Sequence, residues 1–363
     1  MRVEIVDSLD GLREREAEWL TLYRRLPGAS VFTSPAWVLN WIESFATETS
    51  LRCAFVCDEY GLQAVLPMVP VSTRWRRIPV VALTACTNQH SVRSALLFDP
   101  ALRESIFADA QQALRDVGGW DMLLLDGCAG PDSAGCIPQL PDELPVERWQ
   151  HSCLPVHGRW EDYLAGRSRD LRRNLRRAEA DLDAMGQIRF TVIEDDADRL
   201  YEQWVEVDRA SWKADGGETV DSDAQTSGFY LGMLRCFAAR QLLIGGVLSL
   251  DDRPIAVVIC ASDKGVCHTL KTAIREDLSS ARLSLGALVM ARLLAALWSR
   301  PGLYMIDFVS KQPYTERWSA DAFTYERRVA FTASWRGQAA ALLDHAVQRM
   351  TKRRSPVVQT SGN

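Results

Sequence analysis

The sequence predicts an α/β protein built from two similar units, and three observations lead to this prediction. The chain has 363 residues, 47% of them hydrophobic and 25% charged, which is typical of a globular protein with two cores. Short apolar runs that suit buried strands alternate with longer stretches of helical periodicity. The segment 101–126 also resembles 285–307, because each is a helix, a glycine-containing turn and an apolar strand ending in Asp.

The first half begins with a strand over 2–7 and a helix over 9–25. Ser34 and Pro35 have the residue types of an N-cap and a first helical position, so another helix begins there. Asp58-Glu59-Tyr60-Gly61 predicts a hairpin turn between two strands. The strands expected in this half are 51–57, 62–71, 79–84, 94–98 and 120–126, with a helix over 101–117.

A segment without periodicity separates the two halves. Residues 127–148 are rich in Gly, Pro, Asp and Glu, which is typical of a connection. We therefore expect one unit over 1–148 and a second over 149–363.

The second half contains the clearest helix of the chain, over 168–185, because its apolar residues form one stripe. That stripe consists of Leu171, Leu175, Ala178, Leu182 and Met185. The other elements expected are strands over 187–194, 242–250, 254–261, 266–274, 303–309 and 324–333, and helices over 196–212, 229–239, 284–299 and 337–353. We expect residues 355–363 to be disordered.

Charge and cysteine usage exclude several classes of protein. The net charge is −5 and the pI is about 5.7, which argues against a DNA-binding protein. The nine cysteines never form paired CxxC units, so we expect no metal site and reduced thiols. The N-terminus does not resemble a secretory signal, and no run of 18 apolar residues predicts a transmembrane segment. We expect a cytoplasmic protein.

Three segments carry residues suited to binding or chemistry. In the first, a strand (HTLKTAI) and a loop lead to a helix that begins at Ser284-Leu285-Gly286. The unpaired N–H groups at a helix N-terminus suit a pyrophosphate, although an ordinary N-cap is the alternative.

The second segment is an arginine-rich helix. Arg172 and Arg176, like Arg173 and Arg177, lie four residues apart, so like charges face each other. An anionic ligand would relieve this repulsion, because Arg recognises phosphate and carboxylate groups well. A solvated helix face is the alternative.

The third segment follows a buried strand and runs from Asp307 to Trp318. Asp307 and Tyr314 are candidates for proton transfer. The alternative is that Asp307 caps the end of the strand and Tyr314 is a packing residue. His268 is a further candidate base, or a structural hydrogen-bonded residue. Strand alternation predicts that Lys271 lies on the face opposite His268.

In combination, these segments resemble a known family. The chain resembles the acetyltransferases of bacterial cellulose and exopolysaccharide biosynthesis (CelD/BcsL-like), within the GNAT superfamily. The segments that carry this resemblance are FTSPAWVLNWIESFA, YLAGRSRDLRRNLRRAEADLDAMG, DRASWK, HTLKTAIREDLSSARLSLGALVMARLLAALW and IDFVSKQPYTERW. The arrangement is also similar to the Fem-type transferases, which have two GNAT-like units and use aminoacyl-tRNA.

The resemblance implies two GNAT-like units side by side, with acyl-CoA, for example acetyl-CoA, bound at the second. It implies a pantetheine and pyrophosphate site along His268 to Ile274 and the next helix start, with Leu270, Thr272, Ser284, Leu285 and Gly286 as contacts. The candidates for the acceptor site are Arg172, Arg173, Arg176, Trp212 and Lys213, and those for catalysis are Asp307, Tyr314 and His268.

We therefore expect an acyl-CoA-dependent N- or O-acyltransferase that transfers the acyl group directly to a small sugar or metabolite acceptor, which the arginine helix predicts to be anionic. Two alternatives stay open: an aminoacyl-tRNA-dependent transferase, and a non-catalytic GNAT pair that serves as a scaffold.

Overall fold

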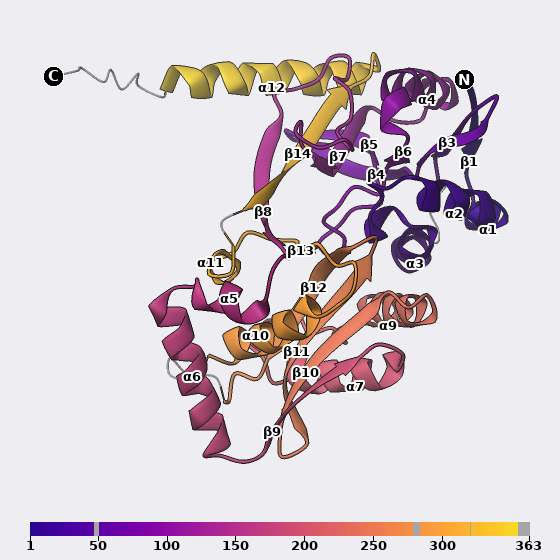
Figure 1. Ribbon diagram of the computed structural model, residues 1–363. Coiled ribbons are helices and arrows are strands. Elements are labelled where there is room, and N and C mark those ends of the chain that lie inside the picture. The colour runs from indigo at the N-terminus through magenta and orange to yellow at the C-terminus, as the bar shows by residue number, and fades with distance from the viewer. Residues whose placement is uncertain (47–50, 279–283, 320, 355–363) are drawn as a thin grey trace. The chain divides into compact units, whose positions relative to one another are not determined.

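The computed structural model describes residues 1–46, 51–278, 284–319 and 321–354 (Figure 1). Its internal contacts divide the chain into two compact units, and neither is continuous in sequence. Within the described part, the first unit comprises residues 1–12, 51–148 and 326–354. The second comprises 13–46 and the described residues between 149 and 325. Residues 13–46 thus belong to the same unit as residue 149, and residues 326–354 to the same unit as residue 148.

The first unit contains two sheets. The strands β1, β2, β3 and β6 form one antiparallel sheet, and α4 packs on β1 and β2. In the other, β4 pairs antiparallel with β5, β5 pairs parallel with β7, and β14 follows. The elements are β1 (Arg2–Val6), α1 (Leu9–Glu14), β2 (Cys53–Asp58), β3 (Gly61–Leu66), β4 (Val69–Trp75), β5 (Ile78–Thr84), β6 (Leu97–Phe98), η2 (Pro100–Leu102), α4 (Arg103–Val117), β7 (Met122–Ala129) and α12 (Trp335–Arg354).

Pro67 divides the strand expected over 62–71. The structure ends β3 at Leu66 and begins β4 at Val69, and the two strands belong to different sheets. Proline has no backbone N–H to donate to a ladder, so the chain changes direction there. The predicted hairpin between β2 and β3 is confirmed.

The second unit is a sheet with helices on both faces. Its strand order is β13-β12-β11-β10-β9, and β12 and β13 are the parallel neighbours. The elements are α2 (Glu16–Arg25), η1 (Val31–Thr33), α3 (Pro35–Phe45), α5 (Trp160–Ala165), α6 (Arg169–Asp183), β9 (Ile188–Ile193), α7 (Ala197–Asp208), α8 (Lys213–Gly216), α9 (Ala224–Ala239), β10 (Leu243–Leu250), β11 (Arg253–Asp263), β12 (Val266–Ile274), α10 (Leu285–Trp298), β13 (Met305–Asp307) and α11 (Pro313–Glu316). The strands β8 (Glu147–Pro155) and β14 (Ala322–Phe331) each have residues in both units.

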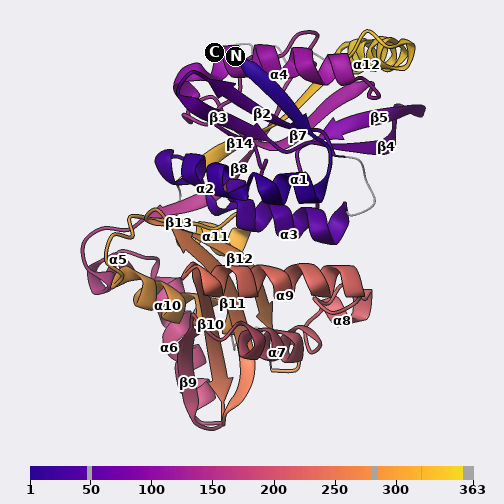
Figure 2. The same cartoon turned by 90° about the vertical axis from the view of Figure 1, so that its right-hand side faces the viewer.

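Two layers of helices cover this second sheet. Figure 1 shows α6 and α10 on one side of β10–β12, and α7 and α9 on the other. The apolar stripe predicted for α6 is buried in one core with α10. On the opposite face α7 contacts β11 and β12, and α9 packs against both α7 and α3 (Figure 2).

Local sequence signals account for several element boundaries. Ser34 Oγ accepts a hydrogen bond from the backbone N–H of Trp37 at 3.2 Å, which confirms the predicted N-cap of α3. The helix expected over 9–25 is interrupted at Arg15, which lies between α1 and α2. The helix α9 begins earlier than expected, because the Asp223 side chain caps it.

The predicted internal repeat is confirmed as a repeat of topology. In the first unit α4 lies between the parallel strands β5 and β7, and in the second α10 lies between the parallel strands β12 and β13. Parallel neighbours require such a crossover connection, so each unit has the same strand–helix–strand element beside antiparallel strands.

Candidate functional site

A β-bulge in β12 changes which side chains share a face of the sheet. Thr269 pairs with Cys260 and Lys271 pairs with Ile259, so Leu270 is the extra residue. The bulge restarts the alternation, and Lys271 therefore lies on the same face as His268, toward α9 and α3. The expectation that strand alternation separates Lys271 from His268 is wrong for this reason.

The strands β12 and β13 part soon after they meet. Their parallel pairing runs from Val266 and Met305 to His268 and Asp307, where β13 ends. Strand β12 continues to Ile274 and stays paired with β11 along its other edge. After His268, the edge of β12 that faces away from β11 pairs with no strand among the described residues. Leu270 and Thr272, both partly exposed, lie on this stretch.

The last pair before the strands part is His268 and Asp307. Both side chains are buried, and His268 Nδ1 lies 3.1 Å from Asp307 Oδ2. Because a carboxylate oxygen accepts hydrogen bonds, Nδ1 is the ring nitrogen that donates a proton in this contact. Nε2 has no hydrogen-bond partner among the residues that the structure describes.

The surroundings of this pair restrict its motion. The Phe32 ring meets the imidazole edge to face, with 5.3 Å between ring centroids. Asp307 Oδ1 accepts a hydrogen bond from the backbone N–H of Val309 at 2.8 Å, and Val309 has a φ of 52°. Asp307 thus orients His268 and also stabilises the turn that follows β13.

Tyr314 is not part of this cluster. It lies on the short helix α11, and 47% of its side chain is exposed. The neighbouring Thr315 is buried and hydrogen-bonds Ser152, so the packing of α11 rests on the residue beside Tyr314. No contact that the structure describes joins the Tyr314 hydroxyl to Asp307.

The start of α10 lies beside the far end of β12. Ser284 is its N-cap residue and makes no side-chain capping bond, while Leu285 is buried. A Cβ atom at Gly286 would meet Ile274 at 3.9 Å, which is ordinary contact. The first backbone N–H groups of α10 therefore lie near the end of the β12 edge. The segment 279–283, part of the predicted loop, falls outside the described residues.

A second polar cluster lies on the α7 and α9 face. Lys213 Nζ pairs with the buried Asp208 carboxylate at 2.8 Å, and Lys271 Nζ lies over the Tyr230 ring, 5.3 Å from its centroid. Burial and repulsion by Lys213 lower the pKa of Lys271 to about 8, against a partial opposing effect of Asp208. Sequence reasoning selected Lys213 but missed Lys271, Asp208 and Tyr230. The DRASWK segment, which contains Asp208, was the available signal.

The arginine helix lies on the opposite face of the same sheet. Its apolar stripe packs with α10, so Arg173 and Arg176 are exposed and Arg172 is partly exposed. Arg173 pairs with Asp170 at 2.9 Å. The predicted acceptor residues therefore separate into two groups, one on α6 and one at Trp212 and Lys213. Trp212 has 62% of its surface exposed.

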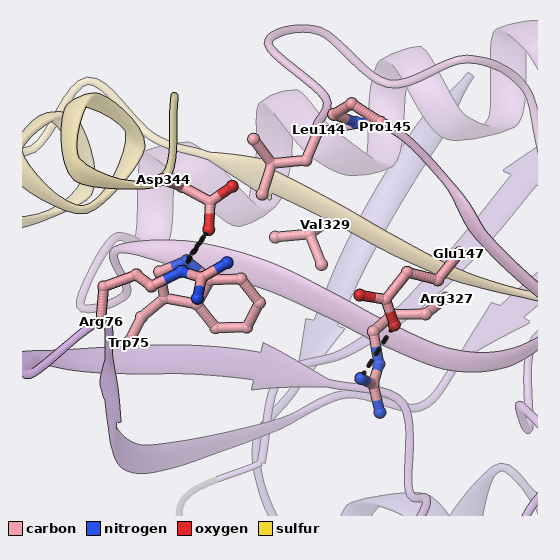
Figure 3. Close-up of a pocket in the computed structure, with 8 residues that line it drawn as sticks. All are labelled: Trp75, Arg76, Leu144, Pro145, Glu147, Arg327, Val329 and Asp344. Carbon is pink, nitrogen blue, oxygen red and sulfur yellow. Dashed lines mark hydrogen bonds and ion pairs between the residues drawn. The ribbon is translucent and has the colours of Figure 1, made fainter. Parts of the chain in front are cut away.

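The first unit has a pocket of its own, with a volume of about 320 Å³ (Figure 3). The figure shows Arg76 paired with Asp344 on one wall and Arg327 paired with Glu147 on the other. Because each arginine already has a carboxylate partner, the pocket offers little free charge to a ligand. Its lining residues are Trp75, Arg76, Leu144, Pro145, Glu147, Arg327, Val329 and Asp344.

Two kinds of feature are absent from the described residues. No helix there is both long and apolar enough to cross a membrane. His, Cys, Asp and Glu side chains form no group of three or more in that part of the chain that could hold a metal ion.

Comparison with family models adds the decisive observation. Residues 169–318 match the model of the acetyltransferase (GNAT) domain, and this segment runs from the start of α6 to just beyond α11. This segment is a GNAT-type acetyltransferase domain. The protein is therefore an acyltransferase. The GNAT domain contains β12, β13, α10 and the His268–Asp307 pair, so the candidate site lies inside the matched segment. The comparison with curated proteins found no match.

Solved structures share the fold over nearly the whole chain. FemX is 9% identical and aligns over 94% of this chain and 99% of its own at a TM-score of 0.62. A conserved protein of unknown function from Bacteroides thetaiotaomicron VPI-5482 is 9% identical, with 91% and 100% covered and a TM-score of 0.51. L-PGS from Bacillus licheniformis is 10% identical, with 91% and 96% covered and a TM-score of 0.50. These similarities concern the fold, and the fold class of two GNAT-like units is confirmed.

Proposed function

We propose that the protein is an acyl-CoA-dependent N- or O-acyltransferase whose donor lies along the open edge of β12. The observation that carries this proposal is the parting of β12 and β13 directly after His268 and Asp307. The open edge offers backbone groups to the amides of a pantetheine arm, and the N-terminus of α10 suits its pyrophosphate. Leu270, Thr272, Ser284, Leu285 and Gly286 are the proposed donor contacts.

The His268–Asp307 pair is the proposed proton-transfer group. With Asp307 holding Nδ1–H, Nε2 of His268 is free to accept the proton of the attacking amine or hydroxyl. This gives His268 the role of base and Asp307 that of a positioning residue, because both Asp307 oxygens accept hydrogen bonds. When bound, the donor supplies an activated thioester carbonyl next to this pair. Tyr314 is a candidate proton donor only if α11 moves, since its hydroxyl does not contact the pair.

We infer an acceptor that is a small sugar or metabolite, in keeping with the resemblance to the cellulose and exopolysaccharide acetyltransferases. The exposed ring of Trp212 suits stacking against a sugar. The nine free cysteines and a thioester donor fit a reducing cytoplasm.

Ligand-induced stabilisation of the full chain tests the donor assignment. Acetyl-CoA at about 100 times its Kd stabilises the fold by about 2.7 kcal/mol, which raises the melting temperature measurably. Dephospho-CoA, which lacks only the 3′-phosphate, and free adenine are matched probes for the contributions of the 3′-phosphate and of the base. If no acyl-CoA from a panel of chain lengths shifts the melting temperature, the proposed donor is wrong.

The exposed arginines of α6 support a second candidate, an aminoacyl-tRNA-dependent transfer. The face formed by Arg172, Arg173 and Arg176 is suited to a phosphate backbone. The FemX-like fold is compatible with this donor. Binding of tRNA that weakens steeply with salt, and that is lost in R172E/R176E, would favour this candidate. Salt-independent or absent tRNA binding would exclude it.

A further inference from the structure

The cluster of Lys271, Lys213, Asp208 and Tyr230 contains more positive than negative charge. It has two ammonium groups and one carboxylate, and that carboxylate already accepts Lys213 Nζ at 2.8 Å and the backbone N–H of Val220 at 2.8 Å. Lys271 forms no ion pair with a residue that the structure describes, and its ammonium group lies over the face of the Tyr230 ring. Asp208 therefore offsets the charge of Lys271 only in part, and this ammonium group is left without a counter-ion of its own.

Neighbouring groups do not supply that counter-ion. Arg275, the next cation along this part of the chain, is buried and is paired with Asp277 at 2.7 Å and with Glu206 at 3.8 Å. The backbone N–H of Glu276 donates to the carbonyl of Ala210 at 2.8 Å, which holds the loop after α7 against the end of β12. This hydrogen bond joins the segment that precedes Lys213 to the segment that follows Lys271.

We propose that Lys271 and Lys213 together bind an anionic group, a carboxylate or a phosphate, of the acyl acceptor. This inference rests on the proposed function, because it places the acceptor on the α7 and α9 face, where His268 also lies. An anion between the two lysines removes their repulsion and supplies the missing counter-ion in a poorly solvated place. Burial is the main cause of the lowered pKa of Lys271, and repulsion by Lys213 adds to it.

The proposal gives the acceptor a chemical class. A cationic amine without an acidic group is repelled by the two ammonium groups, whereas an acidic sugar, a sugar phosphate or an amino acid is attracted. It also assigns anion recognition to β12 and α8 rather than to the arginines of α6, which lie on the other face.

Competitive labelling of the full chain tests this proposal without the reaction. The chain has five lysines, so trace acetylation with acetic anhydride and mass spectrometry follows each separately. We expect inorganic phosphate and succinate to slow the labelling of Lys271 and Lys213 at least fivefold and that of the exposed Lys311 less than twofold. Equal protection of Lys311 at the same concentrations would overturn the proposal, because it indicates non-specific ionic screening.

Variants sharpen the test. Charge-assisted hydrogen bonds are worth about 1.5–3 kcal/mol, so Lys271→Met weakens phosphate binding about 10- to 100-fold, while Lys271→Arg retains most of it. Asp208→Asn removes the competing carboxylate and strengthens phosphate binding. Lys311→Met is the matched control and leaves it unchanged. Unaltered phosphate binding in folded Lys271→Met would overturn the site.

Two further measurements show whether the bound anion belongs to the donor or to the acceptor. They also distinguish a failure of the proposed function from a failure of the anion site. Acetyl-CoA that displaces phosphate from Lys271 would assign the anion to the donor and overturn the acceptor assignment. Phosphate protection of Lys271 in a chain that binds no acyl-CoA would contradict the proposed donor and leave the anion site standing. If the chain binds acetyl-CoA but phosphate and succinate do not protect Lys271, the proposed donor stands and the proposed anion site is wrong.

Discussion

At the scale of single residues, we propose different roles for two side chains on the same face of β12. His268 is held by a carboxylate and an aromatic ring, as a base requires. Lys271 has a pKa lowered by burial and by Lys213, and Asp208 opposes this lowering only in part. The bulge at Leu270 brings both to one face, so this irregularity builds the acceptor side of the proposed site.

Removing the imidazole or its orienting carboxylate tests the proton-transfer role. We expect His268→Gln and Asp307→Asn each to lower kcat by about 10²–10⁴-fold, the usual contribution of general base catalysis, with the KM of the donor nearly unchanged. Tyr314→Phe, on the exposed α11, lowers kcat less than about tenfold. Steady-state kinetics with the true acceptor measures all three.

The two variants differ in stability as well. Asp307→Asn weakens the hydrogen bond from Val309 N–H, so its melting temperature falls, whereas that of His268→Gln changes less. Wild-type kcat in both folded variants would remove the pair from the mechanism.

We expect the charge of Lys271 in the proposed binding site to lower the free energy of unfolding. Its folded-state pKa of about 8 lies below the ordinary value of 10.5, so the unfolded chain binds the proton more tightly and protonation opposes folding. Lys271→Met is therefore more stable than the wild type at pH 7, at about 1.4 kcal/mol per unit of pKa difference. The difference shrinks as the pH rises from 8 to 10.5.

Thermal melts of the two proteins at pH 7 and pH 10 measure this effect. Comparison with Lys311→Met at each pH corrects for the titration of other groups. A stability difference that does not depend on pH would show that the Lys271 ammonium is well solvated.

At the scale of elements, the proposed donor site depends on the end of β12 and the start of α10. Gly286 has room for a Cβ atom against Ile274, so Gly286→Ala folds normally. Gly286→Asp adds a negative charge at the helix N-terminus, which is tolerated by the helix dipole but repels a pyrophosphate.

We therefore expect Gly286→Asp to reduce acetyl-CoA affinity at least 100-fold, and Gly286→Ala to reduce it much less. Isothermal titration with acetyl-CoA measures the affinity, and circular dichroism checks the fold. Equal affinity of a folded Gly286→Asp protein and the wild type would move the donor site away from α10.

At the scale of the whole molecule, the second unit depends on a segment from the other end of the sequence. Trp37 stacks on Phe237, with 5.9 Å between ring centroids, and meets Phe229 edge to face. Asn40 donates a hydrogen bond to the carbonyl of Phe229 at 2.9 Å. These contacts join α3 to α9, which are far apart in sequence but lie in the same unit.

Expressing residues 149–363 alone therefore exposes the aromatic face of α9. We expect this fragment to aggregate or to lack a cooperative melt, although it contains the whole matched GNAT segment. Size-exclusion chromatography and near-ultraviolet circular dichroism test this. A monomeric fragment with a sharp melt would show that α2 and α3 are dispensable for the second unit.

The sequence by itself determined most of the elements and the repeated strand–helix–strand topology. Periodicity, the Ser34-Pro35 start of α3 and the turn before β3 are local signals that neighbouring residues produce. The candidates His268 and Asp307, found as a strand residue and a residue after a buried strand, form a pair in the structure. Because the two residues are 39 positions apart, no local sequence pattern predicts their contact.

Only the tertiary structure decided which of these residues share a site. Strand alternation fails at Leu270 because the bulge depends on pairing with β11, which the sequence of β12 does not encode. The arginine helix faces away from Lys213 because its apolar stripe packs with α10. Residues 13–46 belong to the second unit because of long-range aromatic contacts such as that of Trp37 with Phe237. Contacts of this kind depend on how distant elements pack together, so no single segment of the sequence contains them.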